Sequence, residues 1–186
     1  MVETLIALVV LAVLVGWVVA GYNRLVKSRV RIDEAWAQID TQLQRRHDLI
    51  PNLVNTVKGY ASHERETFEA VTNARAQALQ VSQPGELADA ENQITQALGR
   101  LMMLQENYPD LKADANFRQL QEELAHTENM VASARSHYNA AVRRYDQARQ
   151  VFPTNVLANM FSFEEREYFE VETLEVREAP SVDFGE

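Results

Sequence analysis

The chain contains no cysteine and has only 6 glycines and 5 prolines among its 186 residues. The lack of cysteine excludes disulfides, thiolate metal ligands and cysteine nucleophiles. The scarcity of glycine and proline favours long uninterrupted helices. The formal net charge is -9. Because an acidic chain gains no free energy from releasing the counterions of nucleic acid, we expect no nucleic-acid partner.

The sequence also lacks the short motifs that accompany most catalytic sites. It has no glycine-rich phosphate loop and no GxSxG or GxGxxG motif. His63-Glu64 begins like the HExxH zinc motif, but Thr67 stands where its second histidine would be. A di-iron bundle needs two Glu-x-x-His pairs, and the chain supplies one, Glu123 with His126. We therefore expect no catalytic residue, no metal and no cofactor, with a metal-dependent bundle enzyme at that pair as the alternative.

The most distinctive segment is residues 4–23, which carry no charge and are almost wholly apolar. About 20 apolar residues in a helix cross a hydrocarbon core of about 30 Å, and a helix satisfies its own backbone groups in lipid. The sequence therefore predicts a transmembrane helix over residues 4–23, preceded by a short extracytoplasmic segment, residues 1–3. The anchoring side chains are the larger apolar ones, Leu5, Ile6, Leu8, Val9, Leu11, Leu14, Trp17 and Val18.

Two other interpretations of this segment stay open. Val18 and Ala20 would suit the cleavage site of a signal peptide, which would make the chain an exported helical protein. Against this, the first residues carry no positive charge and the apolar run is longer than usual for a signal. The segment could also be the core helix of a soluble fold, although such helices usually keep a polar face and this one has none.

Basic residues follow the apolar run and predict its orientation. Arg24, Lys27, Arg29 and Arg31 come before the first acid, whereas only Glu3 precedes the run. Positive flanks stay in the cytoplasm, so we expect the N-terminus outside and the rest of the chain inside. The same side chains would lie at anionic lipid headgroups.

Small residues recur along one face of the predicted anchor. Ala12, Gly16 and Ala20 are spaced by four. Small residues at this spacing let two membrane helices approach closely. They therefore predict a self-association face.

Residues 24–165 are expected to form a helical bundle, because apolar residues recur every three or four positions. The first stripe continues directly from the anchor, so the membrane helix and the first bundle helix are predicted to be one rod. Pro51 has no N–H and disfavours helix at the residue before it, which predicts a kink or a break there. Gly59 would lie inside the next helix, where another helix packs closely. This first stripe comprises Leu25, Ile32, Trp36, Ile39, Leu43 and Ile50.

Further helices are marked by their ends and by a heptad pattern. Residues 82–86 are a linker in which Pro84 and Glu86 suit the start of a third helix, and residues 108–110 end it. The fourth helix has apolar residues seven apart, which indicates an antiparallel seam. We expect the aromatic stretch near Phe161 to pack on the bundle end and residues 166–186 to be an acidic tail. The two heptad rows are Phe117, Leu124, Val131, Tyr138, Tyr145 and Phe152, and Leu120, Thr127, Ala134, Ala141 and Ala148.

Several short segments along the chain form a recognisable series. They include residues 22–26 (YNRLV), 48–54 (DLIPNLV), 57–60 (VKGY), 116–121 (NFRQLQ), 127–129 (TEN), 138–139 (YN), 152–153 (FP) and 180–184 (PSVDF). With these segments the chain resembles the LemA family of bacterial membrane proteins over essentially its whole length. The resemblance is specific because many polar positions match in order. One departure is Asp146, where the family pattern has asparagine.

The resemblance implies an all-α, single-pass protein of the bacterial inner (cytoplasmic) membrane with no established enzyme activity. Magnetosome-associated proteins of the same type suggest, by analogy, a role in membrane organisation. We interpret the chain as a membrane-tethered scaffold or adaptor whose partners are the lipid membrane and either further copies of itself or other membrane-associated proteins. The residues expected to contact a partner are Arg46, Asp48, Asn52, Lys58 and Phe161.

Overall fold

The computed structural model describes residues 1–170, and its regular elements in that range are all helical. The prediction of an all-α fold is confirmed. Most of the predicted acidic tail, together with the family-like positions Pro180, Val182 and Phe184, lies outside the described residues. The elements are α1 (Val2–Lys58), α2 (Arg65–Ala78), α3 (Pro84–Met103), the 3-10 turn η1 (Leu104–Glu106), α4 (Pro109–Ala113), α5 (Ala115–Gln150) and α6 (Thr154–Met160).

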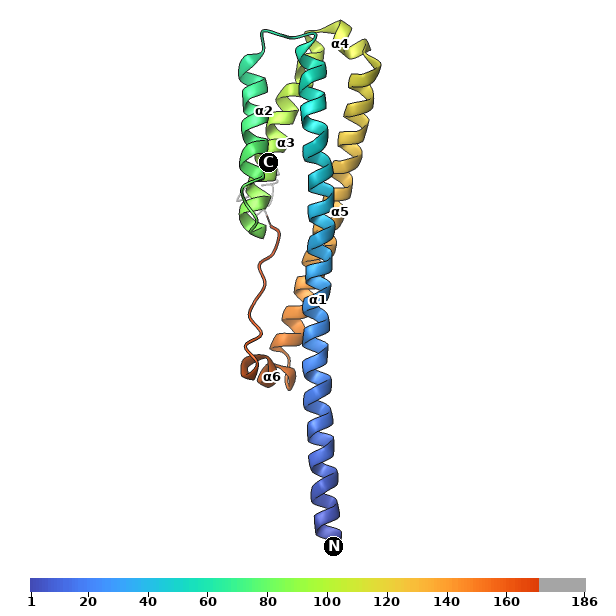
Figure 1. The fold of residues 1–186 in the computed structure, drawn as a ribbon, viewed down its shortest axis with the longest axis vertical. Helices are drawn as coiled ribbons and strands as arrows, with labels where there is room; N and C mark the ends of the chain where they lie inside the picture. Colours follow the sequence, from blue (N-terminus) through green and yellow to red (C-terminus); the bar gives the residue numbers. More distant parts are fainter. Residues whose placement is uncertain (171–186) are drawn as a thin grey trace, which may run out of the picture.

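Helix α1 is a rod that begins near the N-terminus and runs the whole length of the molecule (Figure 1). At about 1.5 Å per residue it is about 85 Å long. Helix α5 runs antiparallel beside its C-terminal part. The α2–α3 hairpin covers one side of this pair at the far end, and α6 with the extended chain after it lies nearer the anchor (Figure 1). The first residues of α1 therefore protrude alone below the bundle.

The bundle has two apolar cores, one above the other. The first lies between the end of α1, the α2–α3 hairpin and the start of α5, around Leu53, Ile94 and Phe117. The second lies between the middle of α1, the start of α3, the end of α5, and α6 with the segment that follows it, around Ile39 and Tyr145. Helices α1, α3 and α5 thus contribute to both cores.

Helix α1 passes through Pro51 without ending, so the predicted break there is wrong. Proline has no N–H to give to the carbonyl four residues earlier, which is that of His47. Arg75 of α2 takes the place of the missing donor, because its Nε lies 2.8 Å from that oxygen. The chain turns instead after Lys58, so Gly59 follows the end of α1 and does not receive another helix.

The remaining predicted helices are present, but the third ends at Met103 and not at residues 108–110 as predicted, and the seam has one exception. Helix α3 begins at Pro84, and Glu86 lies in its first turn. Helix α5 begins where Asp114 accepts a hydrogen bond of 2.7 Å from the backbone N–H of Phe117. The seam residues from 117 to 148 are buried or half-buried, but Phe152 lies beyond the end of α5 and is 77% exposed.

The chain after α6 is part of the fold as far as Phe169, so the tail does not begin at residue 166 as predicted. Phe169 is buried, and its backbone pairs with the side-chain amide of Asn139 through bonds of 3.0 and 2.9 Å. Tyr138 and Tyr145 donate their hydroxyls to the carbonyls of Glu167 and Glu164 at 2.8 and 2.7 Å. The two seam tyrosines are therefore core residues whose polar ends hold this extended segment on α5.

Candidate functional site

The predicted membrane anchor is a bare helix. Within residues 1–170, α1 is the helix that is long and apolar enough to cross a membrane, and none of its most apolar 18-residue stretch is buried. Of the eight predicted anchoring side chains, Val18 is half-buried against the lower core and the others, from Leu5 to Trp17, are exposed. The alternative of a buried core helix is therefore wrong for this fold.

The predicted self-association face is open. Ala12, Gly16 and Ala20 are exposed, and a Cβ added at Gly16 would meet no atom within 4 Å. Nothing within the described part of the chain packs on this face, and self-association through it stays a prediction.

The basic residues after the anchor divide between two sides of α1. Arg24, Lys27 and Arg31 line an open groove between α1 and α5, and Arg144 of α5 lines the same groove. Arg29 points elsewhere, with its guanidinium carbon 5.7 Å from the ring centre of Phe163. The groove has a volume of about 960 Å³, and its other lining residues are Ala20, Asn23, Ser28, Gln147, Ala148, Val151 and Thr154.

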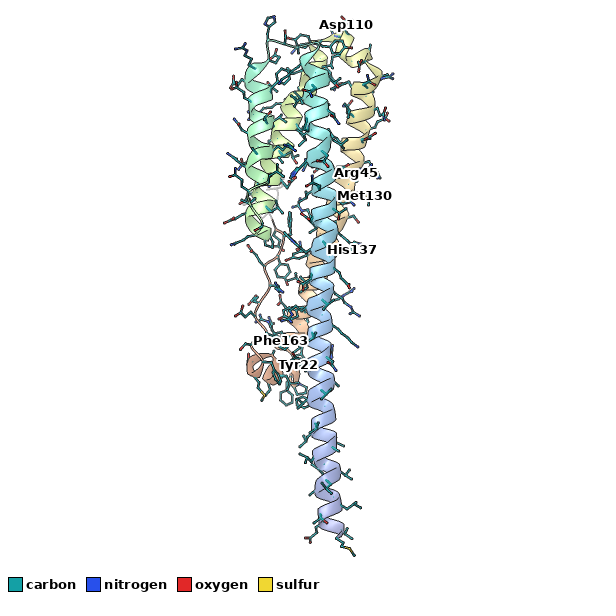
Figure 2. All side chains as sticks on the ribbon, viewed as in Figure 1. Tyr22, Arg45, Asp110, Met130, His137 and Phe163 are labelled. Atoms are coloured by element: carbon teal, nitrogen blue, oxygen red, sulfur yellow. The ribbon has the colours of Figure 1, made fainter. Side chains whose placement is uncertain are left out.

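Helix α6 packs against α1 where the predicted membrane span ends. A Cβ on Gly21 would lie 2.5 Å from Cδ1 of Leu157, so any larger residue there would have to displace that side chain. The ring of Tyr22 meets the rings of Phe161 and Phe163 edge to face, with centres 5.0 and 5.6 Å apart. Figure 2 shows Tyr22 and Phe163 together at this lower end of the bundle.

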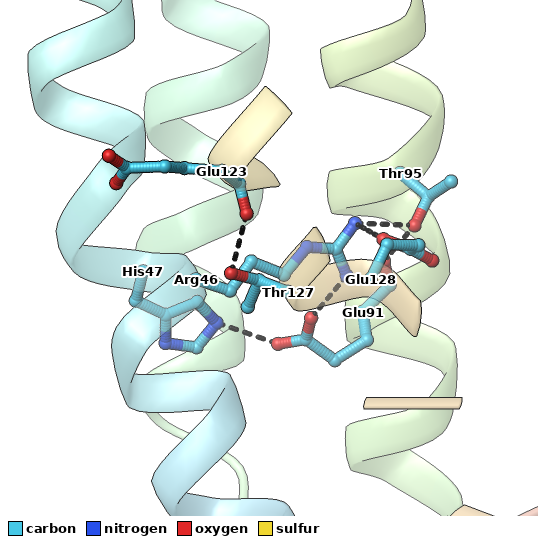
Figure 3. Close-up of polar contacts among 7 residues, drawn as sticks. All are labelled: Arg46, His47, Glu91, Thr95, Glu123, Thr127 and Glu128. Atoms are coloured by element: carbon cyan, nitrogen blue, oxygen red, sulfur yellow. Dashed lines mark hydrogen bonds and ion pairs between the residues drawn. The ribbon is translucent and has the colours of Figure 1, made fainter. Parts of the chain in front are cut away.

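Arg46 is not a surface residue, which corrects its assignment to a partner surface. It is 2% exposed, and its guanidinium lies 2.8 Å from Oε2 of Glu91 on α3 and 2.7 Å from Oε2 of Glu128 on α5. It also donates to the hydroxyl of Thr95 at 2.7 Å. Glu91 is equally buried, and its second oxygen lies 2.6 Å from Nε2 of His47 (Figure 3).

This polar cluster of Arg46, His47, Glu91, Thr95 and Glu128 joins α1, α3 and α5 inside the bundle. A buried charge must be paired, because an unpaired ion in a protein interior costs several kcal/mol. The pairing was not predicted, although the sequence contains a signal for it. Arg46 lies three residues after Leu43 on the first apolar stripe, and Glu91 lies three residues before Ile94 on the α3 stripe. A charged residue on each of two apolar stripes indicates an internal ion pair.

The other predicted partner residues are exposed but not gathered in one place. Asp48 and Asn52 lie one turn apart on α1, and Asp48 accepts a hydrogen bond of 2.9 Å from Gln44. Lys58 lies over the ring of Phe68 at the far end of α1, at 5.5 Å from its centre. Phe161 is 45% exposed at the opposite end, beside Tyr22.

The upper part of α1 carries a strip of exposed polar residues. The strip consists of Arg45, Asp48, Asn52 and Asn55, which follow one another at helical spacing. Arg45 thus takes the place of its buried neighbour Arg46 on this surface. We call these residues the α1 polar strip.

The structure gives no support to a metal enzyme. Within residues 1–170, no three His, Asp or Glu side chains converge so that they could hold a metal ion. His126 is exposed, and the carboxylate of Glu123 accepts a hydrogen bond of 3.0 Å from Gln119.

Burial changes the acidity of the tyrosines that hold the extended segment. Burial raises the pKa of Tyr138 to about 12, and it also raises the pKa of Tyr145.

At the far end of the bundle, the hydrogen bond from the backbone N–H of Phe117 lowers the pKa of Asp114. The hydrogen bond of Tyr60 to that carboxylate, 2.9 Å long, raises the pKa of the phenol.

Comparison with known proteins gives one family and a small group of relatives. The pattern that defines the LemA family matches residues 35–184. A magnetosome protein, MamQ 2 of Paramagnetospirillum magneticum, is 25% identical over 195 residues, which cover 88% of this chain and 72% of the relative. Protein LemA of Metamycoplasma hominis is 26% identical over 167 residues, which cover 83% of this chain and 75% of the relative. The magnetosome protein MamQ of Magnetospirillum gryphiswaldense is 24% identical, with 80% and 64% covered.

Proposed function

The chain belongs to the LemA family, and from this membership we propose that it is a non-enzymatic scaffold or adaptor, held in a bacterial inner membrane by one helix. The observation that carries the proposal is the form of α1. Its apolar stretch is bare, and the same helix continues without a break into both cores of the bundle. A helix of this kind fixes the position of the bundle relative to the bilayer.

The proposed orientation places the N-terminus outside and the bundle in the cytoplasm. Arg24, Lys27 and Arg31 are exposed immediately after the apolar stretch, where positive charge holds a flank inside. The magnetosome proteins among the relatives support a role in organising a membrane.

The α1 polar strip is the surface that we propose for a partner. It is exposed along the upper part of α1, which makes it accessible to a second copy or to another membrane-associated protein. Lys58 and Phe161 lie at opposite ends of the bundle and would belong to separate contacts. Ala12, Gly16 and Ala20 offer a further contact between copies inside the bilayer.

Site-specific photo-crosslinking in intact membranes tests this function. A photoreactive amino acid at Asn52 should capture a second copy or a discrete membrane-associated protein, identified by mass spectrometry. The matched control is the same amino acid at Asn73, an exposed asparagine on α2. Equal capture from both positions would overturn the assignment of the strip. A monomeric mass in mild detergent with no captured partner would overturn the scaffold itself.

A further inference from the structure

We propose that the groove between α1 and α5, at the end of the bundle nearest the anchor, binds an anionic phospholipid. The phosphodiester of the headgroup would lie among Arg24, Lys27, Arg31 and Arg144, and the acyl chains would follow the anchor. The proposal rests on the placement of residues 4–23 in a bilayer under the proposed function. It goes beyond that function by naming a ligand class and a site.

The groove changes from apolar to basic along its length. Its residues on α1, from Ala20 to Arg31, recur at helical spacing on one face. Those on α5, from Arg144 to Ala148, do the same, and Val151 follows at the end of that helix. The helices run antiparallel, so Ala20 and Val151 lie at the anchor end while Arg31 and Arg144 lie farther along the bundle. A phospholipid has the same order, because its chains point into the bilayer and its phosphate lies at the interface.

The cations of the groove are available to a ligand. Arg24, Lys27, Arg31 and Arg144 are exposed, and within residues 1–170 none of them forms an ion pair. Glu34 lies with Arg31 and Arg144 in the hollow that adjoins the groove on the side away from the anchor. It would repel a phosphate from that end and leave the membrane side as the favoured position. Asn23, Ser28, Gln147 and Thr154 add hydrogen-bonding groups to the lining.

An apolar surface beside the groove points to the same ligand. Val151 lines the groove and is 59% exposed, and the next residue, Phe152, is 77% exposed. Met160 and Phe161 of the α6 region are 67% and 45% exposed. Because Phe161 contacts Tyr22, these side chains lie at the level where the predicted span ends. Exposed apolar groups at that depth enter the boundary between headgroups and acyl chains.

Arg144 allows a test that leaves the anchor unchanged. It lies on α5, far in sequence from the charges that set the orientation of α1, and it is exposed. Arg143 is the matched control, because it is an exposed arginine on the same helix and is not among the groove residues. The variants Arg144→Gln and Arg143→Gln therefore change the net charge equally.

The measurement is lipid occupancy of the full chain in a nonionic detergent, followed by native mass spectrometry while phosphatidylglycerol is added. We expect phosphatidylglycerol to bind in preference to phosphatidylcholine. Arg144→Gln should weaken that binding by about fivefold, which is the effect of one cation at an anionic surface. Arg143→Gln should leave it unchanged. Circular dichroism should give the same helix content for both variants.

Three results would overturn the proposal. The first is equal binding of phosphatidylglycerol by the two variants. The second is binding of phosphatidylcholine as strong as that of phosphatidylglycerol. The third is binding of inorganic phosphate as tight as that of the lipid, which would assign the groove to a free anion. Extraction with alkaline carbonate separates this proposal from the proposed function. If the unaltered chain is extracted from the membrane, the anchor fails; if it is retained while the variants bind lipid equally, only the lipid site fails.

Discussion

Arg75 donates a hydrogen bond of 2.8 Å from its Nε to the backbone carbonyl of His47. This carbonyl is the one that Pro51 leaves without an amide donor, so a side chain of α2 completes the backbone of α1. The residue before His47 is Arg46, which reaches α3 and α5. One turn of α1 thus binds all the long helices of the bundle together.

Substitution of Arg75 by methionine should destabilise the bundle by about 1–3 kcal/mol, because it leaves a shielded carbonyl unpaired. In a Pro51→Ala background, an amide N–H is restored and the same substitution should cost much less. Urea unfolding of the four combinations in detergent measures this coupling. Arg65→Met on the exposed start of α2 is the control and should have little effect. Equal costs of Arg75→Met in both backgrounds would show that Arg75 does not replace the missing donor.

Substitution of Glu91 by glutamine should cost about 3–5 kcal/mol, because it leaves the buried Arg46 guanidinium with less compensating charge. The charge-matched control is Asp89→Asn on the exposed side of α3. Replacing both partners, as Arg46→Met with Glu91→Leu, should recover most of the lost stability. Unfolding by urea measures each change, and a Glu91→Gln cost no larger than that of Asp89→Asn would contradict the role of the cluster.

Stability should fall as the pH rises above 10. The pKa of Tyr138 is raised from 10.0 to about 12 by burial, so the folded chain keeps a proton that the unfolded chain loses. The contribution of the protonated Tyr138 to the free energy of unfolding is complete below pH 10 and is lost between pH 10 and about 12. The free energy of unfolding should therefore decline less steeply in Tyr138→Phe than in the unaltered chain over this range. Identical slopes would mean that Tyr138 titrates normally in the folded state.

The orientation can be tested by adding single cysteines, because the chain has none of its own. A membrane-impermeant maleimide applied to spheroplasts should label Val2→Cys and leave Ser62→Cys unlabelled. Ser62 is exposed in the turn after α1, so its protection would come from the membrane alone. Permeabilised cells provide the control, in which both positions should react. Labelling of Ser62→Cys in intact spheroplasts would place the bundle outside.

Periodicity and composition predicted the helices and the long apolar stretch at the start of α1, because these depend on local pattern. The continuation of α1 through Pro51 could not be predicted, because the donor to the backbone carbonyl of His47 is Arg75, 28 positions along the chain. The groove was not predicted from the sequence, for the same reason. Arg24, Lys27 and Arg31 stand out beside the apolar run, but Arg144 joins them only after α5 has folded back along α1. Likewise, Phe169 was predicted to belong to the tail, because its hydrogen bonds to the side chain of Asn139 form only in the folded bundle.

The most direct test of the membrane-tethered rod is a nitroxide scan of single cysteines over residues 4–31 of the full chain in liposomes. We expect collisions with oxygen to dominate over residues 4–19 and collisions with a water-soluble nickel complex to dominate from about Arg24 onward, with a helical period and no mobile stretch between them. Access of the nickel complex to all these positions would show that the segment does not span the bilayer. A freely mobile stretch between residues 18 and 28 would show that the bundle hangs on a flexible tether instead of standing on one continuous helix.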